Sequence, residues 1–86
     1  MKKHLQALVR HLEKFISGED VSVQWAKDAE TLLDQVGILD EQLDELQDWL
    51  SLYRPEGGGY LYGRDAMDGM CRRIISHLKD KEQEHR

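Results

Sequence analysis

This 86-residue chain has four histidines and one cysteine, the residue types that most often ligate zinc. His4 and His11 stand seven positions apart, His77 lies near the end of the last apolar stripe, and His85 belongs to the C-terminal tail. A zinc site uses closely spaced ligands such as H-x-x-x-H or paired cysteines, and the sequence contains neither pattern. We therefore expect no metal and no cofactor, and we expect these histidines on solvated helix surfaces.

Nucleophilic or acid–base chemistry would need Cys71 or a pair of carboxylates. Cys71 and His77 are six positions apart on a predicted helix, which separates them widely around its axis. Cys71 also falls in an apolar stripe, so we expect a buried structural thiol. Asp44 and Asp48 would need a cleft that gives them different protonation states, and an exposed helix face offers none. The sequence therefore indicates a protein that is not an enzyme.

The segment 53–63 holds the only proline, four of the seven glycines and all three tyrosines. Pro55 ends any helix that arrives from the N-terminal side, and the glycines at 57–59 allow a sharp turn. These glycines lack the lysine and hydroxyl residue of a phosphate-binding loop. Tyr60 and Tyr62 offer large amphipathic rings of the kind enriched in interface hot spots. This segment is therefore predicted to be a loop that anchors a partner protein.

The net charge of −5 is unevenly distributed along the chain. Residues 19–56 carry eleven acids against Lys27 and Arg54, a net charge of −9. On one face of a predicted helix, four carboxylates follow one another without an intervening base: Glu41, Asp44, Glu45 and Asp48. Such a face disfavours direct contact with nucleic acid and favours a basic protein partner.

Apolar spacing predicts two helices in the N-terminal half. The first covers about residues 3–16, and Gly18 supplies the signal that stops it. The second follows Ser22 or, alternatively, Asp20 as its N-cap, and Gly37 closes it. Ile38 and Leu39 then form a short connection, and apolar residues at such a place are expected to cover the end of a bundle.

Two further helices are predicted in the C-terminal half. Asp40 is the expected N-cap of the third, and Asp65 of the fourth. Gly69 inside the fourth helix suggests close packing against a neighbour. Both tryptophans of the chain, Trp25 and Trp49, are expected in the core.

These elements predict an all-α fold, a small antiparallel four-helix bundle in regular or distorted form, with a glycine-rich loop before the last helix. Residues 1–86 make a single helical domain, whose polar tail at 79–86 is expected to fray. One cysteine fits a reducing compartment. The sequence shows neither an export signal nor a membrane-spanning segment, so we expect a cytoplasmic protein that does not bind membranes.

The middle and C-terminal part of the chain, about residues 40–78, resembles the small acidic bacterial immunity proteins that neutralise colicin-type nuclease toxins. The run Asp40-Glu41-Gln42-Leu43-Asp44-Glu45-Leu46 leads to Pro55-Glu56-Gly57 and then to Tyr60-Leu61-Tyr62. In the DNase-inhibiting branch of that family an acidic helix supplies specificity, and a Pro-x-Gly segment with paired tyrosines supplies the main anchor. The phrase Phe15-Ile16-Ser17-Gly18-Glu19 also looks like the end of the first helix in immunity proteins of the colicin D type.

Three hypotheses follow for the function. The first is a non-enzymatic inhibitor of a basic nuclease toxin that binds through Glu41, Asp44, Glu45, Asp48, Tyr60 and Tyr62, and for which a monomer is expected. The second is a self-associating helical adaptor or regulatory subunit with Trp25, Tyr53 and Met67 in a homodimer interface. The third is a phage inhibitor of a host defence nuclease, which would use the same surface as the first.

Overall fold

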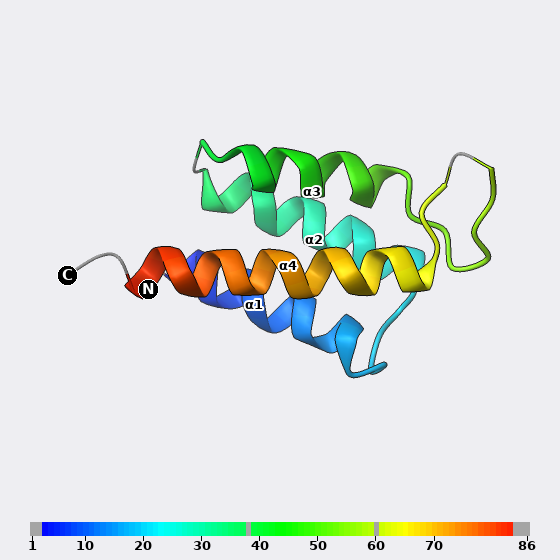
Figure 1. Ribbon diagram of the computed structural model, residues 1–86, viewed down its shortest axis with the longest axis horizontal. Coiled ribbons are helices and arrows are strands. Elements are labelled where there is room, and N and C mark those ends of the chain that lie inside the picture. The colour runs from blue at the N-terminus through cyan, green and yellow to red at the C-terminus, as the bar shows by residue number, and fades with distance from the viewer. Residues whose placement is uncertain (1–2, 38, 60, 84–86) are drawn as a thin grey trace.

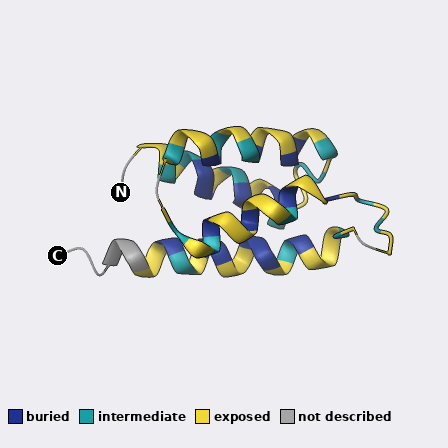
Figure 2. Cartoon of the chain, turned by 90° about the horizontal axis from the view of Figure 1, so that it is seen from above, coloured by how far each residue is buried: buried dark blue, intermediate teal, exposed yellow. Residues whose placement is uncertain are grey.

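The computed structural model describes residues 3–37, 39–59 and 61–83. They form four helices: α1 (Lys3–Ile16), α2 (Val23–Val36), α3 (Glu41–Ser51) and α4 (Arg64–Gln83). Successive helices run in opposite directions, and α1 and α3 each contact both α2 and α4 (Figure 1). In the second view α3 crosses α4 obliquely (Figure 2). The predicted all-α fold with four helices is therefore confirmed, including the bounds of the first helix.

The core is built from the apolar stripes that the sequence predicts. Each helix contributes residues that recur every three or four positions, so their side chains meet on one face. The fully buried side chains come from all four helices and from the segment after α3: Leu8, Leu12, Trp25, Leu46, Leu50, Tyr53, Met67, Cys71 and Ile74. Because Trp25, Tyr53 and Met67 lie inside one molecule, the homodimer interface proposed for these three residues is wrong.

Side-chain caps set the starts of α2 and α3. Ser22 is the N-cap of α2, and its hydroxyl accepts a hydrogen bond of 3.1 Å from the backbone N–H of Trp25. Asp20, the alternative cap, instead accepts hydrogen bonds from the Ser22 hydroxyl and N–H, and these bonds lower the pKa of its carboxyl group. Asp40 caps α3 as predicted, and its Oδ1 accepts a hydrogen bond of 2.8 Å from the backbone N–H of Gln42.

Three local expectations are wrong. Asp65 lies in the first turn of α4 and is not its N-cap, because the carbonyl of Gly63 already accepts the N–H of Met67 at 3.0 Å. Gly69 is exposed, and a Cβ built there would meet no heavy atom within 4 Å, so it marks no close packing. Leu39 is 97% exposed and does not cover the bundle end, while Ile38 lies outside the described residues.

The C-terminal end of α4 overlaps the segment 79–86 that was expected to fray. The helix continues past Lys79 to Gln83, so helical backbone covers most of the segment expected to fray. Residues 84–86 lie outside the described part of the chain. Within that part, α4 is the longest helix, yet neither it nor any other helix combines the length and apolar character needed to cross a membrane.

An aromatic cluster ties α1, α2 and the end of α3 together. The ring centroids of Trp25 and Phe15 lie 4.6 Å apart, and both rings contact the ring of Tyr53 edge-on. The indole N–H of Trp25 donates to the carbonyl of His11 at 2.8 Å, while Nε2 of His11 lies 2.8 Å from the carbonyl of Trp25. His11 is therefore half-buried and structural, which corrects the expectation of a solvated histidine.

The hydroxyl of Tyr53 gives a test of this cluster. It donates to the carbonyl of Val21 at 2.5 Å, and Tyr53→Phe should lower the free energy of unfolding by about 1 kcal/mol. Urea unfolding measures this, with Tyr62→Phe as a control expected to change stability by less than ~0.5 kcal/mol. Burial raises the pKa of Tyr53 above its ordinary 10.0, so its contribution is present below pH 10 and lost as the pH rises through the folded-state pKa. Equal stability of Tyr53→Phe and wild type would contradict the role of this bond.

Cys71 gives a second test. The thiol is fully buried, and burial, with a smaller contribution from Asp68, raises its pKa from 9.0 to about 12. A disulfide reagent such as Ellman's reagent needs a thiolate that it can reach, so the folded protein should not react at pH 8. The protein unfolded in urea should react with one equivalent of the reagent per chain. Fast reaction of the folded protein would contradict the burial of the Cys71 thiol.

Candidate protein-binding surface

The four carboxylates predicted to contact a partner lie on the solvent face of α3. Glu41, Asp44, Glu45 and Asp48 are all exposed, and the face opposite to them buries Leu43, Leu46 and Leu50. This separation follows from the 3.6-residue period, because positions 41, 44, 45 and 48 share one side of the helix. Figure 2 shows the outer side of α3 as predominantly exposed.

Few bases neutralise this acidic face. Glu45 forms an ion pair of 2.6 Å with Arg73 of α4, and about half of each side chain remains exposed. In the described part of the chain, no ion pair involves Glu41, Asp44 or Asp48. Asp48 also stands in the last turn of α3, where the helix dipole favours a base. The charges are thus available to a partner.

A polar network fixes the start of α3 against α4. Nε2 of His77 lies 2.8 Å from the second carboxylate oxygen of Asp40, and its Nδ1 lies 3.1 Å from the side-chain nitrogen of Gln42. A neutral ring with its proton on Nε2 satisfies both bonds, since Gln42 then donates to Nδ1. His77 is half-buried in this network, so the expectation of a solvated histidine is wrong here too. The network holds the acidic face in one orientation.

The glycine-rich segment after α3 is a loop closed at its base. The N–H of Tyr62 donates to the carbonyl of Leu52 at 3.1 Å, and the N–H of Arg54 donates to the carbonyl of Tyr62 at 3.0 Å. Inside the loop, Gly57 and Gly58 adopt φ values of 75° and 151°, which side chains disfavour. The loop extends beyond the end of the bundle (Figure 1).

The loop carries an aromatic pair that the sequence reveals only in part. The ring of Tyr62 stacks on that of Trp49 with centroids 3.9 Å apart and planes 5° from parallel. Both residues are half-buried, so Trp49 is not the full core residue that we expected. Tyr60, the other predicted anchor, lies outside the described residues. Of the two tyrosines that the structure describes, Tyr53 is the one in the core.

Apolar side chains adjoin this pair. Leu52 is 41% exposed and continues the helical row of Asp48 by one further turn, and Leu61 of the loop is 38% exposed. We name the α3–loop surface as the four acids together with Trp49, Leu52 and Tyr62. The sequence did not single out Trp49 or Leu52 as surface residues. Trp49 and Leu50 both fit the apolar stripe of α3, and the structure buries Leu50 and leaves Trp49 half-buried.

The described residues offer little for catalysis or metal binding. Among them, no group of three or more His, Cys, Asp or Glu side chains is placed to hold a metal ion. Cys71 is enclosed in the core, while His11 and His77 serve contacts between elements. The α3–loop surface instead places four exposed carboxylates beside the exposed Leu52 and the half-buried Trp49–Tyr62 pair.

Comparisons with protein-family models, with curated proteins and with solved structures find no match for this chain.

Asp48 provides a test of whether the acidic face serves stability. Asp48→Lys removes repulsion with Asp44 and Glu45, adds an attractive pair four residues after Asp44, and suits the dipole at the end of α3. We expect it to raise the free energy of unfolding by about 0.5–1 kcal/mol in urea titrations at low salt. Asp48→Asn should give a smaller gain, and a destabilised Asp48→Lys would show that the carboxylate has a structural partner.

Proposed function

We propose that this protein is a non-enzymatic inhibitor that binds a basic protein, and specifically an immunity protein that neutralises a nuclease-type toxin. The observation that carries the proposal is the continuity of the α3–loop surface. Four exposed carboxylates lead along one helix face to the exposed Leu52 and the Trp49–Tyr62 pair. The resemblance of residues 40–78 to the colicin-type immunity proteins points to the same class of partner.

The acidic face would act first, during encounter. A nuclease presents bases where it binds phosphate, and carboxylates on a fixed helix can occupy those contacts and block the active site. Glu41, Asp44 and Asp48 are available without first breaking an ion pair among the described residues, whereas Glu45 must exchange Arg73 for a base of the partner. Long-range attraction then raises the association rate in a salt-dependent manner.

The aromatic pair would act second, as the anchor. Trp and Tyr carry much of the binding energy in protein interfaces because they bury large rings at little entropic cost. Trp49 and Tyr62 are already held together by stacking, and the backbone of Tyr62 is held by bonds to Leu52 and Arg54. A preorganised anchor loses less freedom on binding. The buried free thiol of Cys71 fits action in a reducing compartment such as the cytoplasm.

Charge reversal tests the steering role. The probe is a basic, toxin-like protein, sought in the reading frame beside this gene or by recovery with the chain from its host. Stopped-flow fluorescence measures its association rate at increasing salt. For wild type the rate should fall steeply with ionic strength, and Asp44→Lys with Asp48→Lys should lower it at least ~10-fold at low salt. Lys27→Gln on α2 is the matched surface control. A rate independent of salt and of these charges contradicts the steering role.

Truncation of the rings tests the anchor separately. Trp49→Ala and Tyr62→Ala should each weaken binding by at least ~2 kcal/mol, mainly through faster dissociation. Isothermal titration calorimetry measures the affinity, and stopped-flow measures the dissociation rate. Tyr62→Phe should bind nearly as tightly as wild type because it keeps the stacked ring. Tyr60→Ala is expected to have a comparable effect. Unchanged affinity for the alanine variants, with the folded state confirmed by circular dichroism, would exclude an aromatic anchor.

A further inference from the structure

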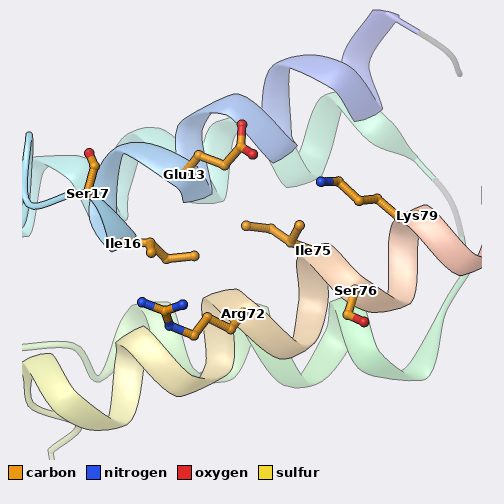
Figure 3. Close-up of a pocket in the computed structure, with 7 residues that line it drawn as sticks. All are labelled: Glu13, Ile16, Ser17, Arg72, Ile75, Ser76 and Lys79. Carbon is orange, nitrogen blue, oxygen red and sulfur yellow. The ribbon is translucent and has the colours of Figure 1, made fainter.

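A second recessed surface lies on the side of α4 away from α3, between α1 and α4. It is an open groove of about 510 Å³. Figure 3 shows Ile16 of α1 and Ile75 of α4 pointing toward one another across its floor, with Arg72 and Lys79 on either side of them along α4. Glu13 of α1 stands on the opposite rim. A smaller hollow of about 270 Å³ adjoins it at Ile16 and Ser17, and its charged lining residues are Arg64, Asp65 and Asp68.

The charges of this groove differ from those of the α3–loop surface. In the described residues Lys79 takes part in no ion pair, and Arg72 pairs only with Asp68, at 2.9 Å, while 62% of its side chain stays exposed. Two bases thus flank an apolar floor on a chain whose net charge is −5. The complementary ligand has acids at both ends and an apolar centre.

The dimensions indicate a helical occupant. Arg72 and Lys79 are seven positions apart, two helical turns or about 10.5 Å along α4. The smaller hollow carries Asp65 and Asp68, so the part of the groove that suits an acidic occupant is the stretch between Arg72 and Lys79. A helix with acids at positions i and i+7 and apolar residues at i+3 and i+4 would place all three groups on one face.

The carboxylate of Glu13 separates this ligand from other anions. Nucleic acid and anionic membranes present negative charge along their whole length, and Glu13 on the rim would repel them. A protein helix can instead place a base opposite Glu13 while its acids meet Arg72 and Lys79.

We infer that the α1–α4 groove is a docking site for an acidic amphipathic helix of a second protein. Such a site goes beyond inhibition of a basic partner, because it would let the chain hold two proteins at once, one on each side of α4.

A designed peptide tests the groove directly. The probe is a fluorescein-labelled helical peptide of about 15 residues with Glu at i and i+7, Leu at i+3 and i+4, and alanine and a single lysine elsewhere. Fluorescence anisotropy should show saturable binding below ~1 mM, and Lys79→Glu should weaken it at least ~10-fold. The same variant should bind a peptide with one Glu replaced by Lys more tightly than the original peptide. Because Lys79 has no ion pair among the described residues, its replacement should leave thermal unfolding unchanged.

Three further outcomes decide the inference. Replacing both Leu residues of the peptide by Gln should abolish binding. If the Gln peptide still binds, or if anionic vesicles bind as well as the original peptide, the groove is only an anion-binding patch and the proposal is overturned. Asp48→Lys on the opposite side of α4 should leave the peptide affinity unchanged, so the result is separate from that of the α3–loop surface. Absence of saturation at ~1 mM, or equal affinity for wild type and Lys79→Glu, would also overturn it.

Discussion

The contact on which the other features depend is the burial of Tyr53 beside Phe15 and Trp25. Tyr53 is the second residue after α3, and its hydroxyl reaches the carbonyl of Val21 in the turn before α2. It therefore fixes the end of α3 against the first half of the chain. A helix of only 11 residues is marginal by itself, so its geometry comes from such tertiary contacts.

The position of Tyr53 also determines what the loop can present. Residues on either side of it, Leu52 and Arg54, form the backbone bonds that hold Tyr62 at the base of the loop. Tyr62 then stacks on Trp49, which stands in α3 four positions before Tyr53. The position of the half-buried aromatic pair therefore depends on the packing of the apolar core. At the other end of α3, hydrogen bonds between His77 and the side chains of Asp40 and Gln42 fix the start of the helix against α4.

Much of the fold could be predicted from local chemistry. Stripes such as Leu8, Leu12 and Phe15, and stop signals such as Gly37, act within a few residues, so a sequence reports them directly. The start of α4 could not be predicted from Asp65, because the helix begins one residue earlier, at Arg64, where the carbonyl of Gly63 accepts the N–H of Met67. The roles of His11 and His77 also depend on partners 14 and 35 or more positions away.

The candidate site was predictable to a similar extent. The four acids are a local pattern, and the structure shows all of them exposed. The partner of Tyr62 was not predictable, since Trp49 and Leu50 compete for the same apolar stripe and only packing decides that Leu50 is buried. The contribution of Tyr60 stays a prediction, because that residue lies outside the described part of the chain.

We propose that one contiguous surface, made of α3 and the base of the loop, binds a basic protein. The most direct measurement is a comparison of amide NMR spectra of the isotopically labelled chain, free and bound to its basic partner. The account predicts large shift changes in residues 41–52 and at Tyr62, and small changes in α1 and in the buried residues of α2. Changes concentrated on α1 and α2, with α3 and Tyr62 unaffected, would contradict it.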